Sequence, residues 1–224
     1  MRNLREALIN FIYPPHCPAC GSYTEHRGAW CPLCLEQTLH IYRLPLSPEM
    51  LRVLPGAWAL GRYHGALREL IRRLKYQGKR STLPYLEEFL SAALPQLPAE
   101  LRQTELVIPV PLFAAKEKQR GFNQSELIFQ SLCQQQGLPL RRMLVRCRAT
   151  RPQYGLGAAE RRENMKDAFQ LAANPSVQNE VQGRHIILVD DILTTGATLC
   201  ACAEVLHQAG AASVRALVLA SDRG

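Results

Sequence analysis

Two adjacent acidic residues lie between an apolar run and a hydroxyl-rich turn in the stretch 186–198. The carboxylates of Asp190 and Asp191 are suited to accept hydrogen bonds from a sugar diol and to hold Mg²⁺ directly or through water. The turn opens a predicted helix, whose free backbone N–H groups favour a monophosphate, and the missing side chain of Gly196 lets the backbone approach closely. The residues of this turn are Thr194, Thr195, Gly196, Ala197 and Thr198. The pattern predicts a phosphosugar site.

A purely structural role is the alternative interpretation of the same stretch. The two acids would then end a strand, Thr198 would cap a helix and Gly196 would only turn the chain. An arbitrary strand and helix would favour this interpretation, but the complete string favours a ligand site. The sequence contains neither G-x-x-x-x-G-K-[ST] nor G-x-G-x-x-G, which disfavours an ATPase and a Rossmann dinucleotide site.

Four cysteines near the N-terminus form two C-x-x-C pairs, Cys17 with Cys20 and Cys31 with Cys34. Each pair aims two thiolates at one point, and together they complete a tetrahedron around Zn²⁺ at about 2.3 Å per sulfur. Four thiolates close the site, so we expect it to be structural or partner-binding. A redox pair and iron in the same cage are the alternatives, whereas a zinc deaminase is excluded because no histidine begins H-x-E.

The remaining cysteines are scattered, and we expect them to be packing residues. They are Cys133, Cys147, Cys200 and Cys202. Since the chain has no recognisable secretion signal, metal binding is favoured over disulfides for the paired cysteines.

Composition places the chain among globular proteins, with 47% hydrophobic and 21% charged residues. Its 224 residues suffice for one well-buried domain and a small appendage. The formal net charge of +8 suits a nucleic acid or a phosphorylated metabolite without choosing between them. Because no apolar stretch approaches the roughly 18 residues of a membrane helix, and the first residues include Glu6 without a small-residue cleavage site, we expect a cytoplasmic protein with no membrane span.

The elements that must position these residues follow from periodicity. A buried strand over 185–190, a helix over 198–209 and a second buried strand over 214–220 predict parallel strands joined by a crossover helix. The fold class is therefore α/β. We expect an N-terminal helix and zinc module over 1–45 and the main domain over 56–224.

Further elements are predicted upstream and between these strands. Asn123 is expected to cap a helix over 124–136 that stops at Gly137. The other predicted helices lie at 1–12, before Gly78, at 83–94 and near 158–167, the other strands at 57–63, 105–110 and 143–147, and a surface loop at 172–182.

The stretch 186–198 resembles the signature of type I phosphoribosyltransferases, which is an apolar strand, two acids, two apolar residues and a TTGxT-like turn. In that family the acids bind the ribose hydroxyls of phosphoribosyl pyrophosphate (PRPP), which implies this role for Asp190 and Asp191. The turn binds the 5′-phosphate, which implies that role for residues 194–198. Purine-base enzymes of the family often have Asp at the position of Thr194, so the resemblance to hypoxanthine or guanine salvage enzymes is weaker.

The rest of the chain resembles the ComF/GntX group of that superfamily over nearly its full length. The resemblance rests on the cysteine pairs, Leu74-Lys75-Tyr76, Ile108-Pro109-Val110-Pro111-Leu112, Arg120-Gly121-Phe122-Asn123-Gln124, Gln153, Glu160-Arg161 and Asn164. Members are associated with competence, DNA uptake or the use of external DNA as a nutrient. The resemblance implies a type I phosphoribosyltransferase-like parallel sheet flanked by helices, behind a small four-cysteine zinc ribbon.

Two main hypotheses follow. The first is a protein that binds PRPP with Mg²⁺ and acts in DNA uptake or nucleotide recycling, with turnover left open. Its candidate pyrophosphate and substrate contacts are Lys116, Lys118, Arg120, Asn123, Gln124, Arg161 and Asn164. The second is a non-catalytic adaptor for single-stranded DNA or DNA-uptake proteins, regulated by PRPP. Its candidate nucleic-acid contacts lie on a basic helix face, and they are Arg68, Arg72 and Lys75. The alternative interpretation of this face is a solvated helix surface without a partner. A redox switch through the cysteine pairs is a third, weaker hypothesis.

Overall fold

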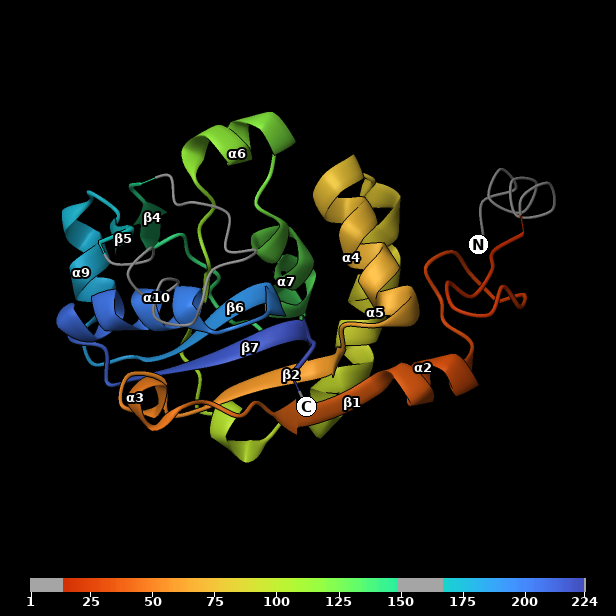
Figure 1. Ribbon diagram of the computed structural model, residues 1–224, viewed down its shortest axis with the longest axis horizontal. Helices are drawn as coiled ribbons and strands as arrows, with labels where there is room; N and C mark the ends of the chain where they lie inside the picture. The colour runs from red at the N-terminus through yellow and green to blue at the C-terminus, as the bar shows by residue number, and fades with distance from the viewer. Residues whose placement is uncertain (1–13, 149–166, 224) are drawn as a thin grey trace.

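The fold is organised around a five-stranded sheet with the spatial order β1-β2-β7-β6-β3 (Figure 1). The structure is a computed structural model and describes residues 14–148 and 167–223. The strands are β1 (Leu39–Arg43), β2 (Ala57–Arg62), β3 (Leu106–Pro109), β6 (His185–Leu193) and β7 (Ser213–Ser221). β1 is antiparallel to β2, while β2, β7, β6 and β3 are parallel neighbours. The predicted α/β class with a mostly parallel sheet is confirmed.

The two faces of the sheet carry different helices, and buried residues alternate between these faces along β6. Ile186 and Leu188 pack in one core, and Ile187 and Val189 pack in the other. The first core is shared with α9 (Pro175–Val181), α10 (Ala197–Gln208) and the ribbon of β4 (Leu144–Arg146) and β5 (Phe169–Leu171). The second core is shared with α4 (Gly65–Gln77), α5 (Leu83–Ala93) and α7 (Gln124–Gln135). β6 is therefore covered on both faces, as its continuous apolar run predicts.

Local signals set the ends of several helices as predicted. The apolar face of α4 is buried at Leu67 and Ile71, and the helix ends at Gly78, which has a φ of 62° and donates its N–H to the Arg73 carbonyl. This left-handed C-cap favours glycine. Asn123 caps α7 through Oδ1, which accepts from the backbone N–H of Ser125 at 3.0 Å.

One predicted loop is wrong. Within 172–182, residues Pro175–Val181 form α9, because Asn174 Oδ1 accepts from the Ser176 N–H at 3.1 Å and Pro175 takes the first helical position. Val177 and Val181 are buried, which anchors this helix to the core. Cys147 is exposed rather than packed, whereas the buried positions of Cys133, Cys200 and Cys202 agree with the prediction.

Several short elements have no counterpart in the predictions. They are α2 (Pro32–Thr38), β1, α3 (Pro48–Leu51), α6 (Ala114–Arg120), β5 and three 3₁₀ turns at Arg80–Thr82, Leu94–Gln96 and Ala99–Leu101. β1 lies within the expected N-terminal unit 1–45 yet pairs with β2 of the main domain. Among the described residues, no helix is both long and apolar enough to cross a membrane. The helices predicted at 1–12 and near 158–167 lie outside the described residues, apart from position 167.

The cysteine-bearing segment is docked on α5. Trp30 Nε1 donates to the Tyr85 carbonyl at 2.9 Å, and its ring centroid lies 5.9 Å from that of Phe89. Tyr85 in turn donates its hydroxyl to the His16 carbonyl at 3.3 Å. A side chain at Gly28 would collide with Pro84, so only glycine allows this close approach. Buried aromatic packing therefore joins the segment to the main domain.

Candidate functional site

The acidic pair lies near the carboxyl end of β6, two residues before the strand ends, on the edge where open parallel sheets bind ligands. Asp190 Oδ1 accepts from Ser125 Oγ at 2.7 Å and from the backbone N–H of Asp191 at 2.9 Å. Asp191 is almost fully buried, and its Oδ2 lies 3.1 Å from Lys75 Nζ. The first turn of α7 and the last turn of α4 thus hold one carboxylate each.

The pKa values of Asp190 and Lys75 are both shifted by their surroundings. Burial, and then the negative charge of Asp191, raises the pKa of Asp190 to about 7, although Lys75 and Ser125 act in the opposite direction. Burial lowers the pKa of Lys75, but the charges of Asp191 and Asp190 outweigh it and leave that pKa above its ordinary value. Lys75 is therefore charged at neutral pH, and a second cation near the pair would favour the ionised form of Asp190.

The turn after β6 leads into the start of α10. Gly196 is the N-cap of α10 with a φ of 84°, and its carbonyl accepts the Cys200 N–H at 2.9 Å. Thr195 Oγ1 is buried and has no hydrogen-bond partner within 14–148 and 167–223. Met50 of α3 packs directly on Gly196, where a side chain would collide with its methyl group. A phosphate oxygen would satisfy the Thr195 hydroxyl, and the start of a twelve-residue helix supplies N–H donors.

The region after β3 lies beside the acidic pair. β3 pairs with β6, and the Val110 N–H donates to the Val189 carbonyl at 3.0 Å. Asn123 uses both ends of its side chain inside the protein, because Nδ2 donates to the Val110 carbonyl at 2.9 Å while Oδ1 caps α7. This makes Asn123 a capping residue of α7. Gln124 is buried and accepts from Arg120 Nη1.

The other predicted contacts are placed differently. Lys116 and Lys118 are exposed on α6, and Arg161 and Asn164 lie outside the described residues. Arg68 and Arg72 are exposed on α4, but Lys75 turns from that face to Asp191. Its position was readable from the sequence, since Lys75 continues the buried stripe of Leu67 and Ile71 at four-residue spacing. A lysine on such a stripe calls for a counter-ion.

Sequence reasoning did not identify Ser125, Met50 or Arg146 as site residues. Arg146 comes from β4, stacks over Phe169 at 5.5 Å, and lies where the charge of Asp190 acts on it. Nothing in its local sequence marks it, because β4 is three residues long and only tertiary packing brings it to β6. The sequence indicated Ser125 only weakly. It stands in the first turn of the helix that Asn123 was predicted to cap.

The four paired cysteines converge as predicted. The sulfur atoms of Cys17, Cys20, Cys31 and Cys34 all lie within 4.8 Å of one another. A tetrahedral zinc with bonds of about 2.3 Å needs sulfurs about 3.8 Å apart, and Cys20 and Cys31 are 3.6 Å apart. Hydrogen bonds from Ser22 lower the pKa of Cys20 to about 6, while the hydrogen bond with Cys31 raises that of Cys34 to about 12. The donor set fits a structural zinc ion.

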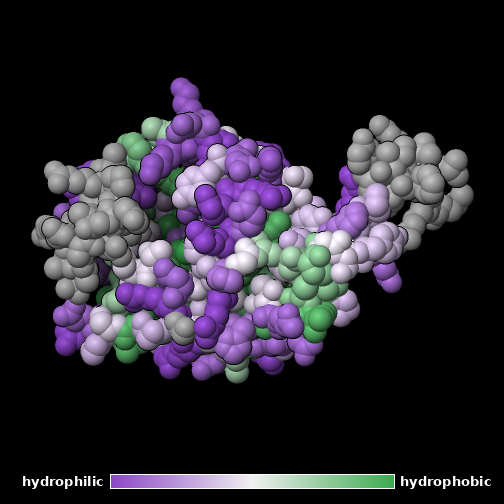
Figure 2. All heavy atoms as spheres, turned by 45° about the vertical axis from the view of Figure 1, so that its right-hand side comes forward, coloured by the Kyte–Doolittle hydropathy of each residue, from purple (hydrophilic) through white to green (hydrophobic). Residues whose placement is uncertain are grey.

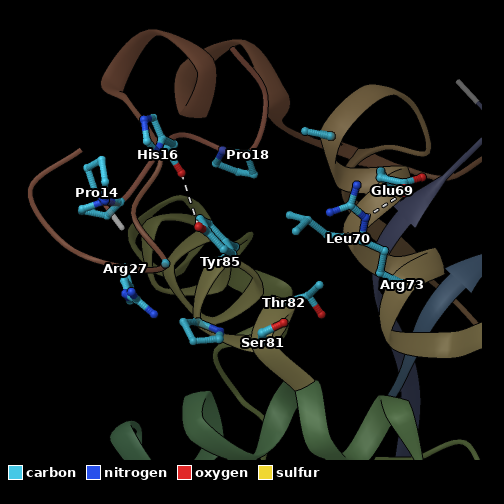
Figure 3. A pocket seen from close by; sticks show the side chains of 14 residues that line it. Pro14, His16, Pro18, Arg27, Glu69, Leu70, Arg73, Ser81, Thr82 and Tyr85 are labelled. Carbon is cyan, nitrogen blue, oxygen red and sulfur yellow. Dashed lines mark hydrogen bonds and ion pairs between the residues drawn. The ribbon is translucent and has the colours of Figure 1, made fainter. Parts of the chain in front are cut away.

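A groove of about 750 Å³ is lined by this cysteine-bearing segment together with α4 and the start of α5 (Figure 3). Arg27 and Pro18 line it from one side, and Tyr85 and Arg73 line it from the other. Arg73 is paired with Glu69 at 2.8 Å. Figure 2 shows that the surface on this side of the molecule is largely hydrophilic. The groove thus combines cationic and aromatic groups next to the basic face of α4.

Comparison with known proteins gives two matching families. Residues 104–224 match the phosphoribosyl transferase domain, and residues 8–46 match the double zinc ribbon domain. The chain is 32% identical to competence protein F of Haemophilus influenzae, covering 92% of this chain and 84% of that protein. It is 32% identical to the DNA utilization protein YhgH of Escherichia coli O157:H7, covering 89% and 81%. Competence protein ComFC of Bacillus subtilis is 26% identical, with 91% and 82% covered.

Proposed function

Because the chain belongs to the family of competence protein F and the YhgH DNA utilization proteins, with a zinc ribbon ahead of a phosphoribosyltransferase domain, we propose that it binds PRPP with Mg²⁺. The binding site is the carboxyl end of β6 and the turn that opens α10. We further propose that the bound sugar serves DNA uptake or the use of external DNA, in the cytoplasm.

One observation carries this proposal. Among the described residues the buried Thr195 hydroxyl has no hydrogen-bond partner, and with the left-handed Gly196 it stands before α10, a few residues after the two carboxylates in the last part of β6. A pentose 5-phosphate presents a diol and a phosphate at matching places. Asp190 and Asp191 would accept from the diol and hold Mg²⁺, while the turn 194–198 would bind the phosphate.

The candidate reaction is displacement of pyrophosphate from C1 of the ribose by an acceptor nucleophile. Mg²⁺ would neutralise charge on the leaving group. The cations of α6, namely Lys116, Lys118 and Arg120, would add donors where that charge develops. The acceptor is to be sought among bases and amines by measuring Mg²⁺-dependent release of pyrophosphate.

Calorimetry tests the proposed site. Wild type should bind Mg²⁺–PRPP, and the double variant Asp190→Asn with Asp191→Asn should lose binding while its circular dichroism stays that of wild type. Asp222→Asn is the matched control, because this exposed acid follows the neighbouring strand β7. Unchanged affinity in the double variant would remove the site assignment.

Single-stranded DNA binding is the second candidate function, favoured by the groove that Arg27, Arg73 and Tyr85 line. Phosphates would meet the arginines, and bases would stack on the tyrosine. Affinity should then fall steeply with salt as counterion release loses its effect. Arg27→Ala with Arg73→Ala should weaken DNA binding and leave PRPP binding intact, because both side chains line the groove. A salt-independent affinity would contradict this function.

A further inference from the structure

Helix α6 carries three cations but buries none of its side chains. It spans seven residues and ends at Gly121, whose N–H donates to the Glu117 carbonyl at 2.7 Å. A helix this short has little stability of its own, and without an apolar face it gains little from packing. Polar contacts must therefore fix where its cations lie.

Arg142 supplies those contacts from outside the helix. Its Nη1 donates to Glu117 Oε1 of α6 at 2.8 Å. Its Nε lies 2.8 Å and 2.9 Å from the two carboxylate oxygens of Glu126 on α7. One planar guanidinium thus spans both helices, and a fork of this kind fixes geometry as well as distance.

The helix that receives Arg142 is the one that touches the acidic pair. Ser125, next to Glu126 in the first turn of α7, donates to Asp190. A second link runs beside it, because Arg120 at the end of α6 donates to the buried Gln124. α6 is therefore tied to the same helical turn that holds a carboxylate of the proposed ribose site.

The position of α6 matches one end of the proposed ligand. β3 flanks β6 on the side opposite β7, and α6 follows β3. The 5′-phosphate turn leads through α10 to β7, which pairs with the other edge of β6. A ribose held at Asp190 with its 5′-phosphate in that turn would direct its C1 substituent away from it, toward the connection after β3.

We propose that Arg142 is a positioning residue, which holds α6 against α7 so that cations of α6 meet the pyrophosphate of the ligand. This inference rests on the proposed PRPP binding. Arg142 does not itself touch the ligand, and it acts by keeping α6 in place. Its side chain is about half exposed, so its removal should change ligand affinity more than folding.

Calorimetry with two ligands tests the proposal. The probes are Mg²⁺–PRPP and ribose 5-phosphate, which has the same sugar and 5′-phosphate but no pyrophosphate. Arg142→Ala should weaken PRPP binding by about tenfold, because the cations of α6 are no longer held in place. The affinity of the Arg142→Ala variant for ribose 5-phosphate should stay within about twofold of wild type. Glu117→Gln should reproduce this split, since it removes only the α6 end of the clamp.

A similar ion pair elsewhere provides the control. Arg184 donates to Glu105 at 2.8 Å, with comparable exposure, at the amino end of β3 and far in the fold from the acidic pair's edge. Arg184→Ala should therefore leave both affinities unchanged. Equal loss of both ligands in Arg142→Ala, or no loss of PRPP, would overturn the role of Arg142. Failure of wild type to bind either ligand would instead reject the proposed function on which it rests.

Discussion

Lys75 Nζ lies 3.1 Å from Asp191 Oδ2, although the two residues are 116 positions apart in the chain. The side chain of Asp191 is 3% exposed and that of Lys75 is 24% exposed, so the pair is largely shielded from water. Lys75 lies outside the matched phosphoribosyl transferase segment 104–224. The segment between the zinc ribbon and that domain therefore supplies a charge to the candidate site.

Replacing Lys75 with methionine should destabilise the protein by about 2 kcal/mol, because Asp191 stays buried without its counter-ion. Urea unfolding of the ligand-free protein measures this change in the free energy of unfolding. Arg73→Met is the control on the same helix, since the Arg73–Glu69 pair is about half exposed on both sides and is worth less than about 0.5 kcal/mol. Equal losses in the two variants would contradict a shielded pair.

The raised pKa of Asp190 makes stability depend on pH. The folded protein holds this proton up to a pKa of about 7, whereas the ordinary pKa of the group is 3.8. The stabilisation that protonated Asp190 gives to the folded state is therefore complete below pH 4 and is lost as the pH rises through 7. In the ligand-free protein, Asp190→Asn should be more stable than wild type by on the order of 2 kcal/mol at pH 8, and by little at pH 4.

Urea unfolding at several pH values between 4 and 8 measures that difference. Asp222→Asn, at an exposed acid, should follow wild type throughout. A gap between Asp190→Asn and wild type that is constant across this range would mean that the carboxyl group does not titrate there.

Sequence patterns predicted correctly those helices and strands whose caps, stops and apolar runs lie within a few residues of one another. The Asn123 cap, the Gly78 stop and the apolar run of β6 are of this kind, and each is found where expected. α9 was missed although Asn174-Pro175 is a local helix start, so that error came from overlooking a signal that the sequence contained. β1 is different, because its half-buried residues become a strand only through pairing with β2.

The candidate site divides in the same way. The two acids and the turn that follows them belong to one short sequence motif, and this motif alone predicted their proposed role. Arg146 and Met50 come from segments distant in the sequence and lie near Asp190 and Gly196. No spacing within the sequence predicts these contacts. Partners from distant segments follow from packing, which periodicity describes only as buried or exposed.

Gly196 should tolerate no side chain. Gly196→Ala would place a methyl group at a φ of +84° and against Met50, and should lower the free energy of unfolding by about 2–3 kcal/mol. Gly137→Ala isolates the backbone cost, because Gly137 has a φ of +64° with no neighbour within 4 Å; about 1 kcal/mol is expected. Combining Gly196→Ala with Met50→Ala should restore part of the difference, as measured by urea unfolding. A double variant no more stable than Gly196→Ala would show that Met50 yields without cost.

The zinc ribbon should contain about one zinc per chain, and its removal should be visible at Trp30. That indole is buried against α5 and bonded to the Tyr85 carbonyl, so loss of the metal should free it and shift its fluorescence to the red. The measurement needs a Trp58→Phe background, because Trp58 is the second of the two tryptophans and its fluorescence would overlap that of Trp30. Chelation should lower the melting temperature by at least about 5 °C, and one equivalent of Zn²⁺ should reverse both changes.

Two cysteine variants separate the ribbon from the rest of the chain. Cys20→Ser removes one of the four converging sulfurs and should lose the bound zinc in elemental analysis. Cys147→Ser removes an exposed thiol outside the cluster and should keep it. Retention of zinc by Cys20→Ser, or a metal-free wild type whose Trp30 stays buried, would contradict a zinc-dependent ribbon. An iron centre in the same cage would instead show charge-transfer absorption in the visible region, which a colourless protein with one zinc per chain excludes.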